Sequence, residues 1–253
     1  MRAIVLAGGK GRRLSPYTVS FPKPLVPVDD MPILEVVIRQ LKAAGFDSIT
    51  MAVGHLAELL VAYFGDGRRW GVRIEYSRED LPLGTVGPLA LIDDLPESFL
   101  VMNGDVLTTL KYDWLYNYHL ASEAELTIAC HRCNTKIDLG VIDFDGRLQV
   151  TGYREKPTLP YDVSMGVYIF NRTVLDLVKS GDHVDFPCMV RSLIERGSVV
   201  KVYLSDDEWL DIGRPSDYAL AAETFASMRD RFLPDLGRKE SVSPSLKLVS
   251  EES

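Results

Sequence analysis

Short apolar runs alternate with amphipathic segments from the start of the chain to Asp105, and this alternation allows few folds. The run Arg2 to Leu6, rich in β-branched residues, stops at Gly8-Gly9 and predicts a buried strand. Between residues 32 and 44, apolar side chains recur at helical spacing, and Gly45 supplies a stop signal. The same patterns predict further strands at 48–53, 72–76 and 99–102 and further helices at 56–64 and 85–91. Such alternation is typical of a parallel sheet with helices on both faces.

The pattern changes after about residue 120. Strands separated only by turns are predicted at 125–130, 140–144, 148–153 and 164–170. The pair Asp145-Gly146 predicts a hairpin over 140–153, so we expect this part to add antiparallel strands to the sheet. Later segments predict helices at 172–179, 186–196 and 215–231 and a strand at 199–203. Residues 1–233 are therefore expected to form one domain, and the polar residues 234–253 a flexible tail.

Composition narrows the class of protein. Hydrophobic residues make up 46% of the chain and charged residues 25%, as in ordinary globular proteins. The net charge is 28 − 36 = −8, unlike that of proteins that neutralise nucleic acid with a basic surface. The three cysteines are too few for a disulfide scaffold, and no apolar run is long enough for a signal peptide or a membrane span. We expect a cytoplasmic protein without nucleic-acid or membrane partners.

A glycine-rich segment follows the first predicted strand and reads LAGGKGRRL over residues 6–14. Glycines let a backbone approach a phosphate chain closely, and Arg13 can donate two hydrogen bonds to phosphate oxygens. The segment is not a P-loop, and Leu14 stands where the dinucleotide-binding pattern has its third glycine. The pattern favours phosphate binding, with an ordinary turn as the alternative.

Lys23 lies between two prolines in the segment PKPLVPV. The prolines restrict the backbone on both sides, so they present the lysine from a stiff, extended segment. Such a lysine is suited to act as a fixed cation. Taken without the preceding glycine loop, it would be interpreted as an incidental charge on a surface loop.

Together, LAGGKGRRLSPYT and the following PKPLVPV resemble the signature of the sugar nucleotidyltransferases, also called nucleoside-diphosphate-sugar pyrophosphorylases. Arg12 departs from the family's usual Thr or Ser, whereas Arg13 keeps its arginine. The resemblance implies a Rossmann-like, doubly wound α/β fold with a mostly parallel, mixed sheet. It also implies the reaction NTP + sugar 1-phosphate ⇌ NDP-sugar + pyrophosphate.

The resemblance implies roles for three cations. Arg13 would hold the β- and γ-phosphates, Lys23 the α-phosphate, and Lys156 of the segment Glu155-Lys156-Pro157 the sugar phosphate. Asp105 and Asp211 match the family's metal-binding aspartates, so the expected cofactor is Mg²⁺, which prefers oxygen ligands. Asp105 also follows a predicted strand, and ligands of open α/β sheets bind at the carboxyl ends of strands.

Smaller residues complete the expected site. The residues expected to bind the nucleotide are Leu6, Ala7, Gly8, Gly9, Gly11, Gly84, Thr85, Asn103 and Gly104. The sugar is expected to contact Gly140, Glu155 and Ser164, and Ser164 stands where many relatives have asparagine. Residues 82–91 look like the mannose-1-phosphate guanylyltransferase version of the family, which favours GTP. Free N–H groups at the start of the helix predicted at 85–91 are expected to bind the base.

The expected substrates are thus GTP and a mannose- or manno-heptose-type sugar 1-phosphate. Alternatives are uridylyl, thymidylyl or cytidylyl transfer to another sugar or cyclitol phosphate, and a non-catalytic regulatory paralogue that binds sugar nucleotides. A glycosyltransferase is disfavoured, because Val106 and Leu107 follow Asp105 where an Asp-x-Asp motif would be needed. No appended β-helix domain is expected, and homo-oligomerisation is left open.

Overall fold

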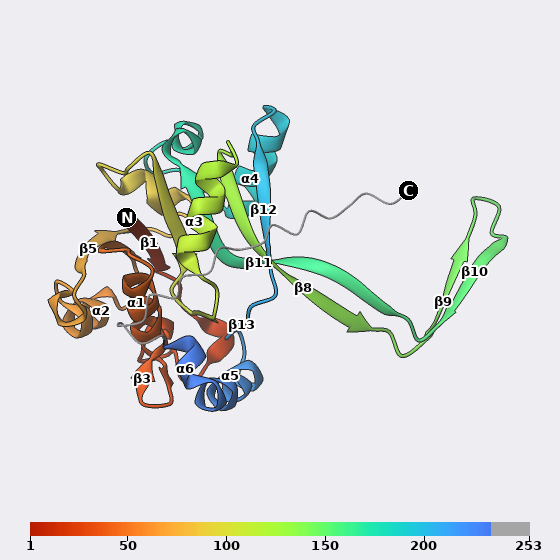
Figure 1. Ribbon diagram of the computed structural model, residues 1–253, viewed down its shortest axis with the longest axis horizontal. Coiled ribbons are helices and arrows are strands. Elements are labelled where there is room, and N and C mark those ends of the chain that lie inside the picture. Colours follow the sequence, from red (N-terminus) through yellow and green to blue (C-terminus); the bar gives the residue numbers. More distant parts are fainter. Residues whose placement is uncertain (234–253) are drawn as a thin grey trace.

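A computed structural model of the chain describes residues 1–233, so the tail predicted at 234–253 lies outside the described residues. Its centre is a seven-stranded sheet with the order β12-β8-β11-β6-β1-β4-β5 (Figure 1). These strands are β1 (Arg2–Ala7), β4 (Ser48–Val53), β5 (Arg73–Arg78), β6 (Ser98–Asn103), β8 (Leu126–Lys136), β11 (Thr158–Asn171) and β12 (Val200–Ser205). β1 is parallel to β4 and β6, β4 to β5, and β8 to β12, whereas β11 is antiparallel to β6 and β8. This is the doubly wound, mostly parallel mixed sheet that the sequence predicts.

Helices cover both faces of the sheet because the buried side chains of each strand alternate. On β1, Val5 faces one core together with Leu34 of α1, whereas Ile4 faces a second core together with Leu193 of α4. The first core also receives residues of α2 and α3. The α-helices are α1 (Ile33–Ala43), α2 (Ala57–Phe64), α3 (Tyr112–Ala121), α4 (Phe186–Glu195), α5 (Pro215–Ser227) and α6 (Arg229–Phe232).

Short elements connect this framework. The 3-10 helices are η1 (Arg12–Leu14), η2 (Lys23–Leu25), η3 (Arg68–Trp70), η4 (Gly87–Leu91) and η5 (Arg172–Leu177). Two small ladders pair β2 (Pro27–Val28) with β3 (Met31–Pro32), and β7 (Val106–Thr108) with β13 (Trp209–Asp211). No helix within residues 1–233 is long and apolar enough to cross a membrane.

Three helix predictions need correction. Residues 85–91 and 172–179 contain the 3-10 helices η4 and η5 instead of α-helices. In η4, Pro88 has no amide hydrogen, and the amides of Val86 and Gly87 donate to the carbonyl of Val184 rather than within a helix. The helix expected at 215–231 is divided at Met228 into α5 and α6.

The hairpin predicted at 140–153 forms, but it does not join the central sheet. Its strands β9 (Gly140–Phe144) and β10 (Val150–Glu155) pair with each other in a separate two-stranded sheet. β8 and β11 are longer than predicted, and they carry this hairpin at the tip of a projection from the body (Figure 1). We call residues 132–162 the arm.

Candidate active site

A cavity of about 860 Å³ opens at the carboxyl ends of the parallel strands β1, β4, β5 and β6. This edge is where open α/β sheets bind their ligands. The residues predicted from the sequence that line it are Leu6, Ala7, Gly8, Gly9, Gly11, Arg13, Lys23, Gly84, Thr85, Asn103 and Asp105. The fold thus brings the glycine loop, the proline-flanked lysine and the first aspartate into one cavity, whose volume is in the range of ligand pockets.

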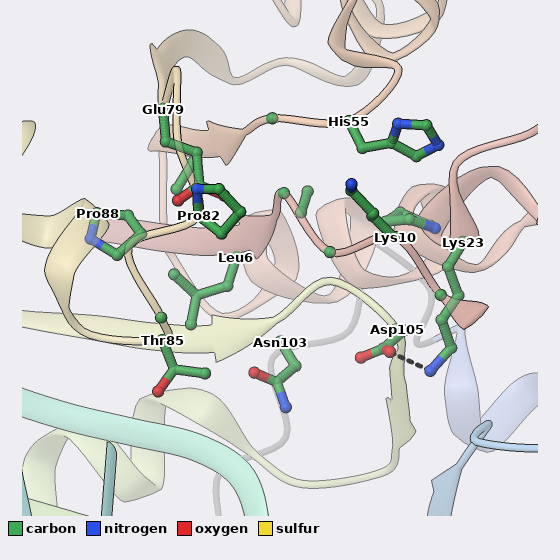
Figure 2. A pocket seen from close by; sticks show the side chains of 18 of the residues that line it. Leu6, Lys10, Lys23, His55, Glu79, Pro82, Thr85, Pro88, Asn103 and Asp105 are labelled. Atoms are coloured by element: carbon green, nitrogen blue, oxygen red, sulfur yellow. Dashed lines mark hydrogen bonds and ion pairs between the residues drawn. The ribbon is translucent and has the colours of Figure 1, made fainter. Parts of the chain in front are cut away.

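The cavity has two chemically different ends (Figure 2). Pro82, Thr85 and Pro88 surround Leu6 together with Glu79, whereas Lys10, Lys23 and Asp105 lie farther along the cavity. The first end offers small and apolar surfaces with one carboxylate, that of Glu79, whereas the second offers the cations Lys10 and Lys23 and the carboxylate of Asp105. This division suits a ligand with a flat apolar part and an anionic part.

Lys23 lies at the charged end and is held tightly. It begins η2, its side chain is buried, and its Nζ donates a hydrogen bond to Oδ2 of Asp105. Gly11 lies against it, with φ of 58°, and a Cβ there would lie 2.9 Å from Cγ2 of Thr18 and 3.2 Å from the Cβ of Lys23. The hydroxyl of Thr18 donates to the carbonyl of Gly11 at 2.8 Å, which ties the glycine loop to the lysine segment.

Glu79 is a site residue that the sequence reasoning missed. A Cβ on Gly8 would lie 2.4 Å from Oε1 of Glu79, so the glycine loop approaches this carboxylate closely. Oε2 of Glu79 accepts a hydrogen bond from the amide of Leu83 at 3.1 Å. Its position after a strand could have identified it, because Glu79 directly follows β5 and lines the cavity. His55, two residues after the end of β4, lines the cavity in the same way.

The segment around Thr85 is fixed by the loop before α4. The hydroxyl of Thr85 accepts a hydrogen bond from the amide of Phe186 at 2.7 Å. Gly84 has φ of 81°, and a Cβ there would lie 2.5 Å from the carbonyl oxygen of Val184. The amides of Val86 and Gly87, which were expected to be free for a base, donate to that same carbonyl. This corrects the expected recognition by free helix-start amides at these two positions.

The second predicted metal ligand, Asp211, does not line the cavity but lies next to it. The ladder of β7 and β13 pairs Asp211 with Val106, the residue after Asp105. Carboxylate oxygens are the donors that Mg²⁺ prefers, so the donor chemistry fits the ion. No group of three or more His, Cys, Asp or Glu side chains that could hold a metal occurs within residues 1–233. A Mg²⁺ ion held by Asp105 and Asp211 would need phosphate oxygens and water as its remaining ligands.

Arg13 is exposed and lies close to the loop that follows β13. A Cβ on Gly213 would lie 3.3 Å from Nη1 of Arg13, and both residues line the cavity. The guanidinium is thus placed at the cavity mouth between the glycine loop and the segment that carries Asp211.

Gly104 and Ser164 lie outside the cavity lining. The amide of Gly104 donates to the carbonyl of Leu6 at 2.9 Å, which ties the end of β6 to β1. Ser164 lies on β11 beside a bulge, where its hydroxyl donates to the hydroxyl of Tyr168 at 3.1 Å. Gly166, with φ of 73°, lies against Asn103, since a Cβ there would lie 2.6 Å from its Nδ2.

Gly140, Glu155 and Lys156 lie together on the arm, and the structure does not bring them to the cavity. Gly140 pairs with Glu155 in the β9–β10 ladder. The hydroxyl of Tyr153 donates to Glu155 at 2.9 Å, and Lys156 is exposed, with φ of 45°. Their role at the sugar stays a prediction.

Comparison with known sequences is consistent with this geometry. Residues 2–227 match a family model described as nucleotidyl transferase. UTP–glucose-1-phosphate uridylyltransferase of Synechocystis sp. is 34% identical over 242 residues, covering 86% of this chain and 61% of the relative. Mannose-1-phosphate guanylyltransferase of Mycobacterium tuberculosis is 32% identical over 225 residues, covering 85% of this chain and 62% of the relative. The chain spans about three fifths of the length of these relatives.

Solved structures share the fold. HddC from Yersinia pseudotuberculosis superposes with a TM-score of 0.70 at 24% identity, covering 88% of this chain and 99% of that chain. A structure of the same protein complexed with GMP-PN gives a TM-score of 0.67 at 24% identity, with the same coverage of both chains. These similarities confirm the architecture.

Proposed function

Because the chain belongs to the nucleotidyl transferase family, we propose that it transfers a nucleotidyl group from an NTP to a sugar 1-phosphate and releases pyrophosphate. One observation carries the proposal. A single cavity holds the glycine loop and the buried Lys23 at a charged end, and the small residues around Thr85 at the other. A nucleoside triphosphate has matching parts, an anionic chain and a flat base.

The reaction is an in-line displacement at the α-phosphorus. An oxygen of the sugar phosphate forms the new P–O bond, and the bond to pyrophosphate breaks. A phosphate monoester is already anionic near neutral pH, so no side chain has to remove a proton. The residues of the chain then act by positioning two polyanions and by neutralising their charge, as in other phosphoryl-type transfers.

Lys23 is the residue best placed for the α-phosphate. Its buried ammonium is paired with Asp105, and triphosphate oxygens can replace that carboxylate as its acceptors. Arg13, at the mouth of the cavity, is assigned to the β- and γ-phosphates. Asp105 and Asp211 would hold Mg²⁺, which would add further neutralisation of phosphate charge when bound. The third cation, Lys156, is assigned to the sugar phosphate.

We propose GTP as the nucleotide and a mannose- or manno-heptose-type 1-phosphate as the sugar. The support for GTP is the string of residues 82–91, which looks like the guanylyltransferase version of the family, together with the similar mannose-1-phosphate guanylyltransferase. The uridylyltransferase among the relatives makes UTP the principal competitor. Both bases would lie at the same end of the cavity, beside Thr85.

The test is a pyrophosphate-release assay of the purified chain with Mg²⁺. GTP, UTP, dTTP, CTP and ATP are each combined with a panel of sugar 1-phosphates. We expect release only when both substrates are present, with GTP and a mannose-type phosphate fastest. A faster reaction with UTP or dTTP would overturn the assignment of the base. Binding of sugar nucleotides without release from any pair would favour the non-catalytic alternative.

A further inference from the structure

The arm makes its polar contacts only with itself within the part of the chain that the structure describes. Its ion pairs join Arg132 to Asp162, Lys136 to Asp138, and Asp143 to Arg154. Backbone pairs of β8 and β11 continue along the arm from Arg132↔Asp162 to Lys136↔Thr158. Figure 1 shows the arm extending away from the body. Within residues 1–233, the arm is thus a well-paired element without a polar contact to the body.

The hairpin at the tip of the arm is amphipathic. Ile142 pairs with Tyr153, and Phe144 pairs with Val150, so these four side chains share one face of the hairpin. All four are exposed, Phe144 by 62% of its surface. The opposite face carries the ion pair of Asp143 and Arg154. We call the first face the apolar hairpin face, and an exposed apolar patch of this kind marks an interaction surface.

The apolar hairpin face also carries the residues expected at the sugar. The alternation along β9 and β10 places Gly140 and Glu155 on this face, and Lys156 follows directly. The cavity of the same chain is lined by the basic residues Lys10, Arg12, Arg13, Lys23 and Arg78, but Lys156, which the family resemblance assigns to the sugar phosphate, is not among them. If the proposed function is correct, the site of one copy lacks its cation for the sugar phosphate.

We propose that two copies of the chain exchange their arms. Each arm lays its apolar hairpin face on the body of the other copy and brings Glu155 and Lys156 to the sugar end of that copy's cavity. This inference rests on the proposed function for the role of Lys156. Exchange of an identical element between copies is a low-cost route to a closed dimer.

A second copy is favoured over the chain's own body because of the arm's pairing. β12 stops pairing with β8 at His131, which is also paired with Val163 of β11. The β8–β11 ladder continues from Val163 to Thr158, which at ~3.3 Å per residue is about 17 Å beyond the last residue that pairs with β12. Folding back onto the same cavity would break this ladder, whereas a second copy can meet the arm as it stands.

The body offers apolar surface beside the cavity for such a partner. Leu81 lines the cavity and is 73% exposed. Tyr17, Val19 and Phe21, between the glycine loop and Lys23, are also exposed. Covering these side chains with the apolar hairpin face would remove apolar surface of both copies from water.

The first test measures mass by sedimentation and compares Phe144→Ser with Asp143→Ser on the opposite face of the same strand. We expect the unchanged chain and Asp143→Ser to be dimers. Phe144→Ser should raise the dissociation constant of the dimer by about 10²-fold or more, since each dimer loses two buried phenylalanines. A monomeric unchanged chain at micromolar concentration overturns the proposal. This measurement needs no activity, so it stands even if the proposed function fails.

The second test asks whether one site uses residues of two copies. Lys23→Ala and Lys156→Ala chains carrying different affinity tags are co-expressed, and the mixed dimer is purified through both tags. With exchanged arms, one of its two sites carries both changes and the other carries neither, so pyrophosphate release recovers to about half of the unchanged dimer. The control is a mixed dimer in which one copy carries Lys23→Ala and the other carries Asp105→Ala. Both changes lie in the body, so each site keeps one defect and pyrophosphate release should not recover. Absence of recovery in the first mixture would show that each arm serves its own copy and would overturn the exchange.

Discussion

Lys23 and Asp105, which lie on separate segments of the chain, form an ion pair inside the cavity, and Lys23 is only 8% exposed. A buried charge is costly unless it is paired, so the contact with Asp105 offsets part of the cost of burying Lys23. The family resemblance assigns Lys23 to a phosphate and Asp105 to a metal ion. The ion pair fixes the positions of both side chains, and the proposed ligands would have to replace the contact between them.

Removal of the ammonium should affect catalysis strongly. Lys23→Ala is expected to lower the kcat for pyrophosphate release by roughly 10²-fold or more, the scale seen when one group that stabilises developing charge is removed. Lys111→Ala is the matched control, because Lys111 is exposed and does not line the cavity. Steady-state kinetics of both variants make the comparison. A near-normal kcat for Lys23→Ala would remove this lysine from the mechanism.

Substitution of Asp211 should change the concentration of Mg²⁺ that the reaction needs. Asp211 is paired with Val106, beside Asp105, so if both carboxylates bind Mg²⁺ as proposed, Asp211→Ala would leave the ion with one of the two. We expect the Mg²⁺ concentration for half-maximal rate to rise by about 10-fold or more, the order lost when a metal site is weakened. Asp176→Ala, a change of an exposed aspartate outside the cavity lining, should leave the Mg²⁺ titration unchanged. An identical titration for Asp211→Ala would contradict the assignment.

The sequence predicts most of the residues at the charged end of the cavity, because these residues follow parallel strands. The strand predicted at 48–53 matches β4, and the glycine loop and Asp105 lie where β1 and β6 end. Parallel strands bring their carboxyl ends to one edge, so local patterns were sufficient to gather these residues. The alternation of strands and helices therefore predicts the ligand-binding edge of the sheet, and this prediction needs no information on side-chain contacts.

Contacts between distant segments could not be predicted in this way. The carbonyl of Val184 accepts the amides that were expected to be free at residues 86 and 87, and no local pattern contains that contact. The close approach of Glu79 to Gly8 is also a tertiary contact. The hairpin of the arm was predicted from Asp145-Gly146, since a turn fixes local pairing, but a turn does not determine where a hairpin lies relative to the body.

Alanine substitutions of the neighbouring Gly8 and Gly9 should have different effects, one on the stability of the fold and the other on binding of the NTP. A Cβ on Gly8 would lie 2.4 Å from Glu79, so Gly8→Ala should lower the free energy of unfolding by about 1–3 kcal/mol, as overpacking does. A Cβ on Gly9 meets no atom within 4 Å and would enter the cavity. Gly9→Ala should therefore keep the stability of the unchanged chain but raise the KM for the NTP.

The control for both glycine variants is Gly146→Ala. A Cβ on Gly146 also meets no atom within 4 Å, and Gly146 lies in the hairpin turn rather than in the cavity lining. We expect Gly146→Ala to change neither the free energy of unfolding measured in urea nor the KM for the NTP. Equal stability of the Gly8→Ala and Gly9→Ala variants would show that the loop can move away from Glu79.

His119 should make the stability of the fold depend on pH. Burial lowers the pKa of His119 below its ordinary value of 6.5. Its Nε2 lies 2.9 Å from Oδ1 of Asn171, which also accepts a hydrogen bond from Ser98, so Nε2 carries the hydrogen. Nδ1 then accepts from the hydroxyl of Thr127 at 2.8 Å. The folded chain thus holds a neutral imidazole whose protonation would turn this acceptor into a second donor.

The sign of the effect follows from proton binding. As the pH falls below 6.5, the unfolded chain binds a proton at His119 more readily than the folded chain does. The contribution of the neutral imidazole to the free energy of unfolding should therefore be fully present above pH 6.5 and decrease as the pH falls below that value. Urea unfolding at pH 7.5, 6.5 and 5.5 measures this change. His119→Gln has no group that titrates in this window and should show a flatter profile. If both chains lose the same free energy between pH 7.5 and 5.5, other groups cause the loss, and the buried imidazole has no part in it.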